Sequence, residues 1–317
     1  MNNQRIPVKS ISCNKNTFGI TRGKIIYLRR EGSLDNGGDF FKINSVAGEG
    51  GSCVCYEATL IGEGKTGRLK EFYPLECSKM GMPFSLERDA QNHIVASEKT
   101  KEAFISARTE FVESYHNLRK VIEKNKNNSD FTNFISDFTI YYGCDSDGNI
   151  LEGSTAYIWT TSEKLTVFDK YIAEVHKHPN INPEHKLFNI LKTMLTLTEC
   201  VKILHENRLL HLDIKPKNFG VLERKGELLT DSIKLFDVNT IIYSPNSSVT
   251  AVYGTEGFRA PEIVNGQADN TSDIYSIGCT LFSALVDNDE IKIEGYSKEY
   301  YTKITQLIDS SKIISAS

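Results

Sequence analysis

Three polar residues with the chemistry of phosphoryl transfer lie within six positions of one another: Asp213, Lys215 and Asn218. The carboxylate of Asp213 can accept the proton of an attacking hydroxyl group, and the ammonium group of Lys215 can neutralise charge on a moving phosphoryl group. The amide oxygen of Asn218 can bind Mg2+. The spacing therefore predicts that this segment supports phosphoryl transfer from a nucleotide.

Elements that would hold a nucleotide are predicted earlier in the chain. Residues 40–46 indicate a strand, which leads into a turn containing Gly48, Gly50 and Gly51. Because glycine lacks a Cβ atom, the NH groups of such a turn can approach phosphate oxygens closely, although an ordinary flexible hairpin has the same composition. Lys70 follows in a second predicted strand, where a lysine is either a solvated edge residue or a phosphate ligand.

The ordered motifs of the chain resemble one enzyme family. Residues 211–218, HLDIKPKN, resemble the catalytic loop HRDxKxxN of the eukaryotic-type (Hanks-type) protein kinases. Residues 254–262, GTEGFRAPE, resemble the end of the kinase activation segment, and residues 232–237, SIKLFD, resemble the strand that ends in the aspartate of DFG. The chain therefore resembles protein serine/threonine kinases, and HLDxKPxN together with KEFYP is most similar to bacterial members.

The resemblance implies roles for individual residues. Asp213 would orient the attacking hydroxyl group. Lys70 would hold the α- and β-phosphates and would pair with a glutamate on the next helix, which the apolar spacing predicts over residues 104–121. Glu110 is the first candidate for this partner, and Glu113 is the second.

ATP and Mg2+ are the cofactors that the resemblance implies. The glycine turn would cover the phosphates, and Thr160, in a predicted strand over residues 156–161, would be the gatekeeper beside the adenine. Asn218 and Asp237 would bind the metal, although an aspartate that ends a strand is also common in turns.

Several positions depart from the family's pattern. Cys53 stands in place of the third glycine, and Val238 and Asn239 replace the Phe and Gly of DFG. Leu212 replaces the arginine that pairs with an activation-loop phosphate in many kinases, which predicts an activity that does not depend strongly on loop phosphorylation. Asp273 matches the aspartate that braces the catalytic-loop backbone, and a helix N-cap is its alternative role.

The implied fold is α+β and bilobal, with a strand-rich N-lobe and a helical C-lobe. Residues 1–39 are predicted to be a lead-in whose role the sequence does not reveal, residues 40–161 the N-lobe and residues 162–317 the C-lobe. No arginine follows Arg259, so the C-lobe is expected to be short or truncated. The helix before the catalytic loop is expected to bury an apolar stripe composed of Leu187, Phe188, Ile190, Leu191, Met194, Leu195, Leu197, Val201 and Leu204.

Composition is consistent with a globular enzyme. The 317 residues are 39% hydrophobic and 25% charged, which is ordinary usage. A net charge of −4 gives no reason to expect nucleic acid or an anionic membrane as a partner. The sequence has no apolar run of bilayer length and no signal-peptide core, and its seven cysteines lack CxxC spacing, which favours a soluble, cytoplasmic protein with free thiols.

The predicted function is ATP-dependent phosphoryl transfer to serine or threonine hydroxyl groups of proteins. Lys215 together with Thr255 resembles the serine/threonine-specific members of the family. Two alternatives remain open. One is a pseudokinase that binds a nucleotide or a protein partner without catalysis, which Cys53 and Val238 motivate. The other is a small-molecule kinase, against which Thr255 and residues 260–262 argue.

Overall fold

A computed structural model describes residues 19–33, 37–49, 52–74, 76–77, 82–161, 165–177, 182–224, 227–238, 240–245, 248–250 and 254–285. The chain divides into two compact units. Unit 1 comprises residues 1–106 and 139–161, and unit 2 comprises residues 107–138 and 162–317.

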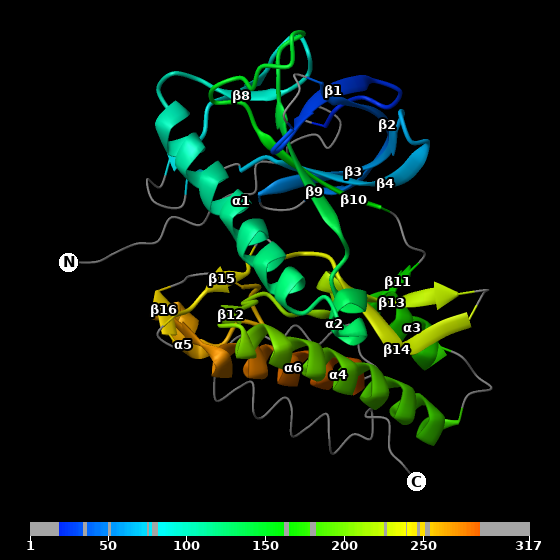
Figure 1. Ribbon diagram of the computed structural model, residues 1–317. Coiled ribbons are helices and arrows are strands. Elements are labelled where there is room, and N and C mark those ends of the chain that lie inside the picture. The colour runs from blue at the N-terminus through cyan, green and yellow to red at the C-terminus, as the bar shows by residue number, and fades with distance from the viewer. Residues whose placement is uncertain are drawn as a thin grey trace. The chain divides into compact units, whose positions relative to one another are not determined.

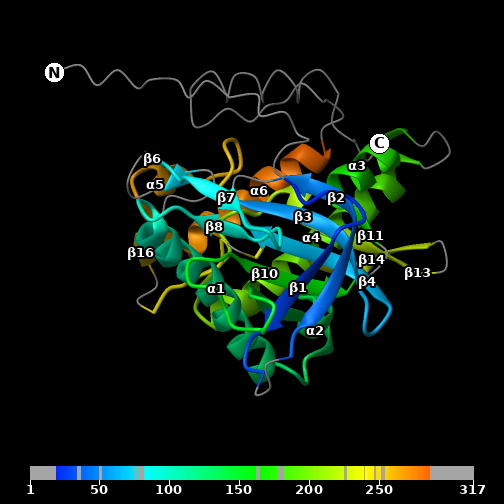
Figure 2. The ribbon, with the colours of Figure 1, turned by 90° about the horizontal axis from the view of Figure 1, so that it is seen from above.

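Unit 1 is built on a closed barrel with the strand order β1-β2-β3-β4-β10-β9 (Figure 1). Its strands are β1 (Ile25–Arg30), β2 (Asp39–Glu49), β3 (Cys53–Leu60), β4 (Lys65–Phe72), β9 (Phe138–Gly143) and β10 (Ala156–Thr161). Viewed from above, β2, β3 and β4 run side by side (Figure 2). Alternate residues of β3 are buried, among them Val54, Tyr56 and Ala58, as expected for strands with one face in a core.

The strand β1 closes this barrel. It pairs antiparallel with β2, where Ile25 is opposite Lys42, and antiparallel with β9, where Leu28 is opposite Gly143. Without β1, the edges of β2 and β9 would present unpaired backbone groups. The strand-rich unit therefore begins before residue 40, where the sequence placed the start of the N-lobe, and part of the predicted lead-in belongs to the barrel.

Two short hairpins stand between β4 and the long helix α1. They are formed by β5 (Glu76–Cys77) with β6 (Met82–Pro83) and by β7 (Leu86–Arg88) with β8 (Ile94–Ala96). The helix α1 (Lys101–Lys124) confirms the helix predicted over residues 104–121. Its first turns belong to unit 1, where the buried ring of Phe104 lies 5.7 Å from that of Phe72 between centroids. The rest of α1 clusters with unit 2.

The helices of unit 2 are α2 (Ser129–Phe134), α3 (Phe168–Lys177), α4 (Pro183–Glu206), α5 (Pro261–Val264) and α6 (Asn270–Leu285), with a 3-10 turn η1 (Pro216–Asn218). Proline at the first position of α4 and an Asn182 side chain that accepts a hydrogen bond from the backbone of His185 fix where α4 begins. The helices α4 and α6 contact each other.

The apolar stripe predicted for α4 is only partly buried. The core side of the helix holds Ile190, Met194, Leu197, Val201 and Leu204. The prediction was wrong for Phe188, Leu191 and Leu195, which are 60%, 44% and 60% exposed. These three follow the helical period on a second face, which the sequence did not distinguish from the first because both faces are apolar.

The strands of unit 2 carry the loops of the candidate site. A three-stranded sheet has the order β11 (Leu165–Val167), β13 (Phe219–Arg224) and β14 (Glu227–Leu235). Two further pairs are β12 (Leu209–Leu210) with β15 (Ile242–Tyr243) and β16 (Ser248–Thr250) with β17 (Gln267–Asp269).

A strand-rich N-terminal part and a helical part confirm the predicted α+β class, whereas the bilobal arrangement and the short C-lobe stay predictions. Among the described residues, every helix is too short or too polar to cross a bilayer.

Candidate active site

The backbone of the predicted catalytic loop is held by one buried carboxylate. Asp273, in the first turn of α6, is fully buried. Its Oδ1 accepts a hydrogen bond from the NH of Leu212 at 2.7 Å, and its Oδ2 accepts one from the NH of His211 at 2.8 Å. Leu212 has φ +63°, a left-handed conformation that is unfavourable for a side chain with a Cβ atom. The predicted bracing role of Asp273 is therefore confirmed.

The Asp213 carboxylate lies within a set of three polar side chains, and Asp213 is 8% exposed. Its Oδ1 accepts a hydrogen bond from Thr255 Oγ1 at 2.6 Å. Its Oδ2 accepts from Lys215 Nζ at 2.9 Å and from Asn218 Nδ2 at 2.8 Å. Lys215 also donates to Thr255 Oγ1, so the structure brings together the residues that the sequence predicted at this position.

His211 is a structural member of the loop. It is fully buried, and its Nδ1 accepts a hydrogen bond from the NH of Asp213 at 3.2 Å. Burial lowers the pKa of His211, so its imidazole stays neutral near pH 7. Because Nδ1 is occupied by a backbone NH, His211 orients Asp213 and is not placed to act as a base.

The two candidate metal ligands lie at one end of the β13–β14 hairpin. Phe219 is opposite Leu235, and the NH of Phe236 donates to the carbonyl of Asn218 at 3.0 Å. Asp237 is the residue that follows Phe236, the backbone partner of Asn218. The amide nitrogen of Asn218 makes both of its hydrogen bonds, to the carbonyl and the carboxylate of Asp213. Its amide oxygen is therefore the atom that would bind a metal.

This donor set fits Mg2+ held jointly with phosphate. Among the described residues, no group of three or more His, Cys, Asp or Glu side chains is arranged to hold a metal alone. Mg2+ is commonly bound through one or two protein oxygens together with substrate phosphates. Asn218 and Asp237 would provide such a pair.

Apolar packing supports the loop at Leu212, the position where the resemblance leads one to expect an arginine. Leu212, 1% exposed, belongs to a buried cluster with Leu210, Ala260, Ile263 and Ala268. Gly254 approaches the same loop so closely that a Cβ atom at this position would lie 2.8 Å from the Leu212 carbonyl oxygen. Its φ of +106° also favours glycine. The segment 254–260 is therefore fitted to the Leu212 backbone and side chain.

Unit 1 gathers the predicted nucleotide-binding residues on one face of its sheet. Gly48, Cys55, Lys70 and Ile158 form a row of directly opposed residues across β2, β3, β4 and β10. Thr160 is two residues beyond Ile158 on β10, and it therefore shares their face. Lys70 is half-buried.

Three predicted site residues have less structural support. Gly50 and Gly51 lie outside the described residues. Glu110 and its alternative Glu113 are exposed on the part of α1 that clusters with unit 2. The pairing of Lys70 with Glu110 therefore stays a prediction.

Two features of the structure escaped the sequence analysis. His205, near the end of α4, donates through Nε2 to Asp273 Oδ2 at 2.9 Å. The sequence signal for His205 was a polar residue beside a buried helical stripe. A second buried carboxylate, that of Glu71, lies next to Lys70 in β4 and is fully enclosed.

The sequence of the chain is similar to those of known protein kinases. A family model described as protein kinase domain matches residues 118–317. The chain is 36% identical over 107 residues to the membrane-associated tyrosine- and threonine-specific cdc2-inhibitory kinase wee-1.3 of Caenorhabditis briggsae. The matched segment covers 34% of this chain and 15% of that protein. It is 30% identical over 112 residues to an aurora kinase of Patiria pectinifera, covering 35% of this chain and 26% of that kinase.

A third relative is the probable serine/threonine-protein kinase fnkE of Dictyostelium discoideum, 32% identical over 149 residues, covering 44% of this chain and 11% of that protein. The chain thus matches only 11–26% of the length of these three relatives.

Proposed function

The chain belongs to the Hanks-type protein kinase family, and we propose that it transfers the γ-phosphoryl group of ATP to serine or threonine hydroxyl groups of proteins. The observation that carries the proposal is the hydrogen-bonded set formed by Asp213 with Lys215, Asn218 and Thr255. This set holds a carboxylate ready to accept a proton and a cation beside it.

Asp213 is the proposed general base. Three donors fix the orientation of its carboxylate, so little reorganisation is needed when a substrate hydroxyl group arrives. Lys215 would balance negative charge on the transferring group from its position 2.9 Å from Asp213 Oδ2. The two side chains have different roles, because the Asp213 carboxylate accepts hydrogen bonds and the Lys215 ammonium group donates them.

ATP with Mg2+ supplies the phosphoryl group when it is bound. Asn218 and Asp237 would hold the metal through their side-chain oxygens. Lys70 would bind the α- and β-phosphates, and the row that joins it to Gly48 across β3 supports a common nucleotide-binding face. Thr160 would limit access at the adenine end.

Activity without loop phosphorylation is part of the proposal. A phosphate on the activation segment acts by pairing with a cation of the catalytic loop. Here Leu212 occupies that position and is buried among apolar side chains. The hydrogen bond to Asp273 and the apolar packing already hold the loop. A phosphate is therefore not needed to order it.

The experiment that tests the function identifies the acceptor group. The full chain is incubated with ATP labelled at the γ-phosphate, Mg2+ and a generic basic protein, and the labelled product is hydrolysed to separate phosphoserine, phosphothreonine and phosphotyrosine. Label on serine or threonine is the expected result. Label on tyrosine alone would overturn the predicted specificity.

Two further outcomes distinguish the alternatives. Binding of ATP and Mg2+ without any transfer identifies a pseudokinase. Transfer to a metabolite and to no protein identifies a small-molecule kinase.

A further inference from the structure

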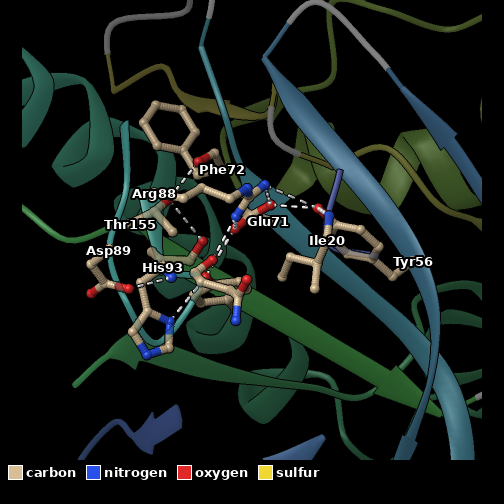
Figure 3. A network of polar contacts seen from close by, with 11 residues as sticks. Ile20, Tyr56, Glu71, Phe72, Arg88, Asp89, His93 and Thr155 are labelled. Carbon is tan, nitrogen blue, oxygen red and sulfur yellow. Dashed lines mark hydrogen bonds and ion pairs between the residues drawn. The ribbon is translucent and has the colours of Figure 1, made fainter. Parts of the chain in front are cut away.

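The buried carboxylate of Glu71 accepts hydrogen bonds from four donor groups inside unit 1 (Figure 3). Oε1 accepts from Arg88 Nη1 and from the Tyr157 hydroxyl, both at 2.9 Å. Oε2 accepts from the Tyr56 hydroxyl at 2.7 Å and from Arg88 Nη2 at 2.8 Å. Glu71, Tyr56 and Tyr157 are all fully buried.

This network is complete in itself. A carboxylate has about four acceptor positions, and a two-pronged arginine with two tyrosines fills them. The Tyr56 hydroxyl also accepts from the NH of Ile20, which precedes β1, at 3.1 Å. No acceptor position on Glu71 is left for a ligand, so the network serves the geometry of the protein and does not bind a substrate. A buried ion pair of this kind is weak evidence of net stability, because the cost of removing both charges from water offsets their attraction.

One end of the network is β4. Side chains alternate along a strand, so Glu71 faces inward while Lys70 projects to the opposite face. Glu71 is joined through Tyr56 to β3 and through Tyr157 to β10, which are the two neighbours of β4 in the sheet. The point from which Lys70 projects is therefore fixed on both sides.

The other end is the hairpin β7–β8. Arg88 is the last residue of β7, and its Nη1 also donates to the Asn92 carbonyl at 2.7 Å within the hairpin turn. Asp89 Oδ1 accepts from the NH of Gln91 and of His93 and completes that turn. The NH of Thr155, the residue before β10, donates to the carbonyl of Ile94 in β8 at 3.0 Å.

The hairpin leads directly into α1. The NH of Thr100 donates to the Ser97 carbonyl and the NH of Phe104 to the Thr100 carbonyl, both at 2.9 Å. The buried Phe104 ring lies 5.7 Å from that of Phe72, the residue after Glu71. Glu71 and Arg88 thus tie the strand that carries Lys70 to the segment that fixes the start of α1.

We propose that Glu71 and Arg88 are positioning residues, which together set Lys70 and the start of α1 for nucleotide binding. This inference rests on the proposed function of Lys70 as a phosphate ligand. In this proposal neither residue contacts the nucleotide, because Glu71 has no acceptor position left and Arg88 is engaged with Glu71 and the Asn92 carbonyl. Their contribution is to hold two elements of the nucleotide-binding unit in one fixed relation, so loss of the network should weaken ATP binding more than it slows the chemical step.

The test compares variants of the full chain in two readouts. Glu71→Gln keeps the shape and removes the charge, and Tyr157→Phe removes one donor and leaves the ion pair intact. Tyr141→Phe is the matched control, because the buried Tyr141 donates to Asp39 at 2.7 Å in the same barrel without touching Glu71. The readouts are KM and kcat for ATP, and amide hydrogen exchange over residues 68–72 and 100–104.

We expect Glu71→Gln to raise KM for ATP about tenfold and to change kcat less than about threefold. Exchange should increase in both segments together. Tyr157→Phe should change KM in the same direction to a smaller extent, and Tyr141→Phe should match the wild type. Arg88→Lys should retain more ATP affinity than Arg88→Met, because lysine keeps the charge without the two-pronged contact.

Wild-type KM in folded Glu71→Gln and Tyr157→Phe, or faster exchange in one segment alone, would overturn the proposal. The exchange measurement needs no turnover. If the wild type transfers no phosphate, the proposed function fails. The exchange rates of the two segments in Glu71→Gln still decide whether Glu71 and Arg88 couple them, because coupled segments change together.

Discussion

Replacing Asp273 with asparagine should loosen the catalytic loop at a cost that the structure allows to be worked out. The fully buried carboxylate accepts from the NH of Leu212, from the NH of His211 and from His205. Asparagine has one acceptor oxygen in place of two. The less costly orientation keeps that oxygen on the side of His211, which leaves the NH of Leu212 facing an amide NH2 group.

The loss has two parts. A hydrogen bond to a charged acceptor contributes about 1.5–3 kcal/mol, and a buried donor left without a partner costs about 1–3 kcal/mol. Leu212 has φ +63°, a conformation that costs about 1–2 kcal/mol and needs the bond to Asp273 to hold it. Asp273→Asn should therefore lower the free energy of unfolding by about 3 kcal/mol or more.

Urea unfolding measures this change, and a loss of about 3 kcal/mol lowers the midpoint by about 1 M or more. The control is Asp269→Asn, the residue directly before the same helix, whose partly exposed carboxylate accepts from the NH of Thr271. Asparagine is as good as aspartate at such positions, so this control should change stability by less than about 1 kcal/mol. Equal midpoints for the two variants would refute the bracing role of Asp273.

Three further predictions follow from burial and backbone geometry. Burial lowers the pKa of both His93 and His211 below the usual 6.5, so the unfolded chain binds more protons as pH falls through that value; the free energy of unfolding should be smaller at pH 5.5 than at pH 7.5, and an equal value contradicts this. Gly254→Ala should reduce stability by about 1–3 kcal/mol, measured by urea unfolding, because of its φ of +106° and the nearby Leu212 carbonyl; a wild-type midpoint argues against a close approach. Leu212→Arg should lower stability by several kcal/mol, because it puts a charge among apolar side chains; a gain in activity on loop phosphorylation without loss of stability would show that the position accepts a phosphate-binding cation.

The sequence correctly indicated that the polar residues of the candidate site lie together, because they are close in the chain or stand in motifs of fixed order. Asp213, Lys215 and Asn218 lie on one loop and turn, so their proximity needs no tertiary information. Thr255 is 42 residues from Asp213, and only the motif at residues 254–262 indicated that the two would meet. The motif predicted this contact, whereas the spacing of apolar residues carries no information about it.

The closure of the barrel by β1 was beyond sequence reasoning. Arg29 is opposite Tyr142 in the register of β1 with β9, and no local pattern connects residues so far apart. Residues 1–39 were predicted only as a lead-in without a role, and nothing in them indicated the two partners of β1.

The sequence contains a signal for the Glu71 network. In a strand with period 2, Glu71 shares a face with Leu69, which is fully buried. A carboxylate on an apolar face predicts a buried partner, yet Arg88 is 17 residues away and separated by a hairpin. Its identity required the tertiary structure.

The exposed residues of α4 show the opposite limitation. Phe188, Leu191 and Leu195 satisfy helical spacing as well as the buried residues do, and apolar character alone does not tell which face meets the core.

The most direct test of the proposed mechanism is the rate of γ-phosphoryl transfer from ATP in Asp213→Asn compared with the wild type and with Asp269→Asn. Removing a general base lowers such rates by about 100- to 10,000-fold. We predict a loss in this range for Asp213→Asn, with ATP affinity unchanged, and a wild-type rate for Asp269→Asn. Transfer by Asp213→Asn at the wild-type rate would contradict the assignment of Asp213 as the base.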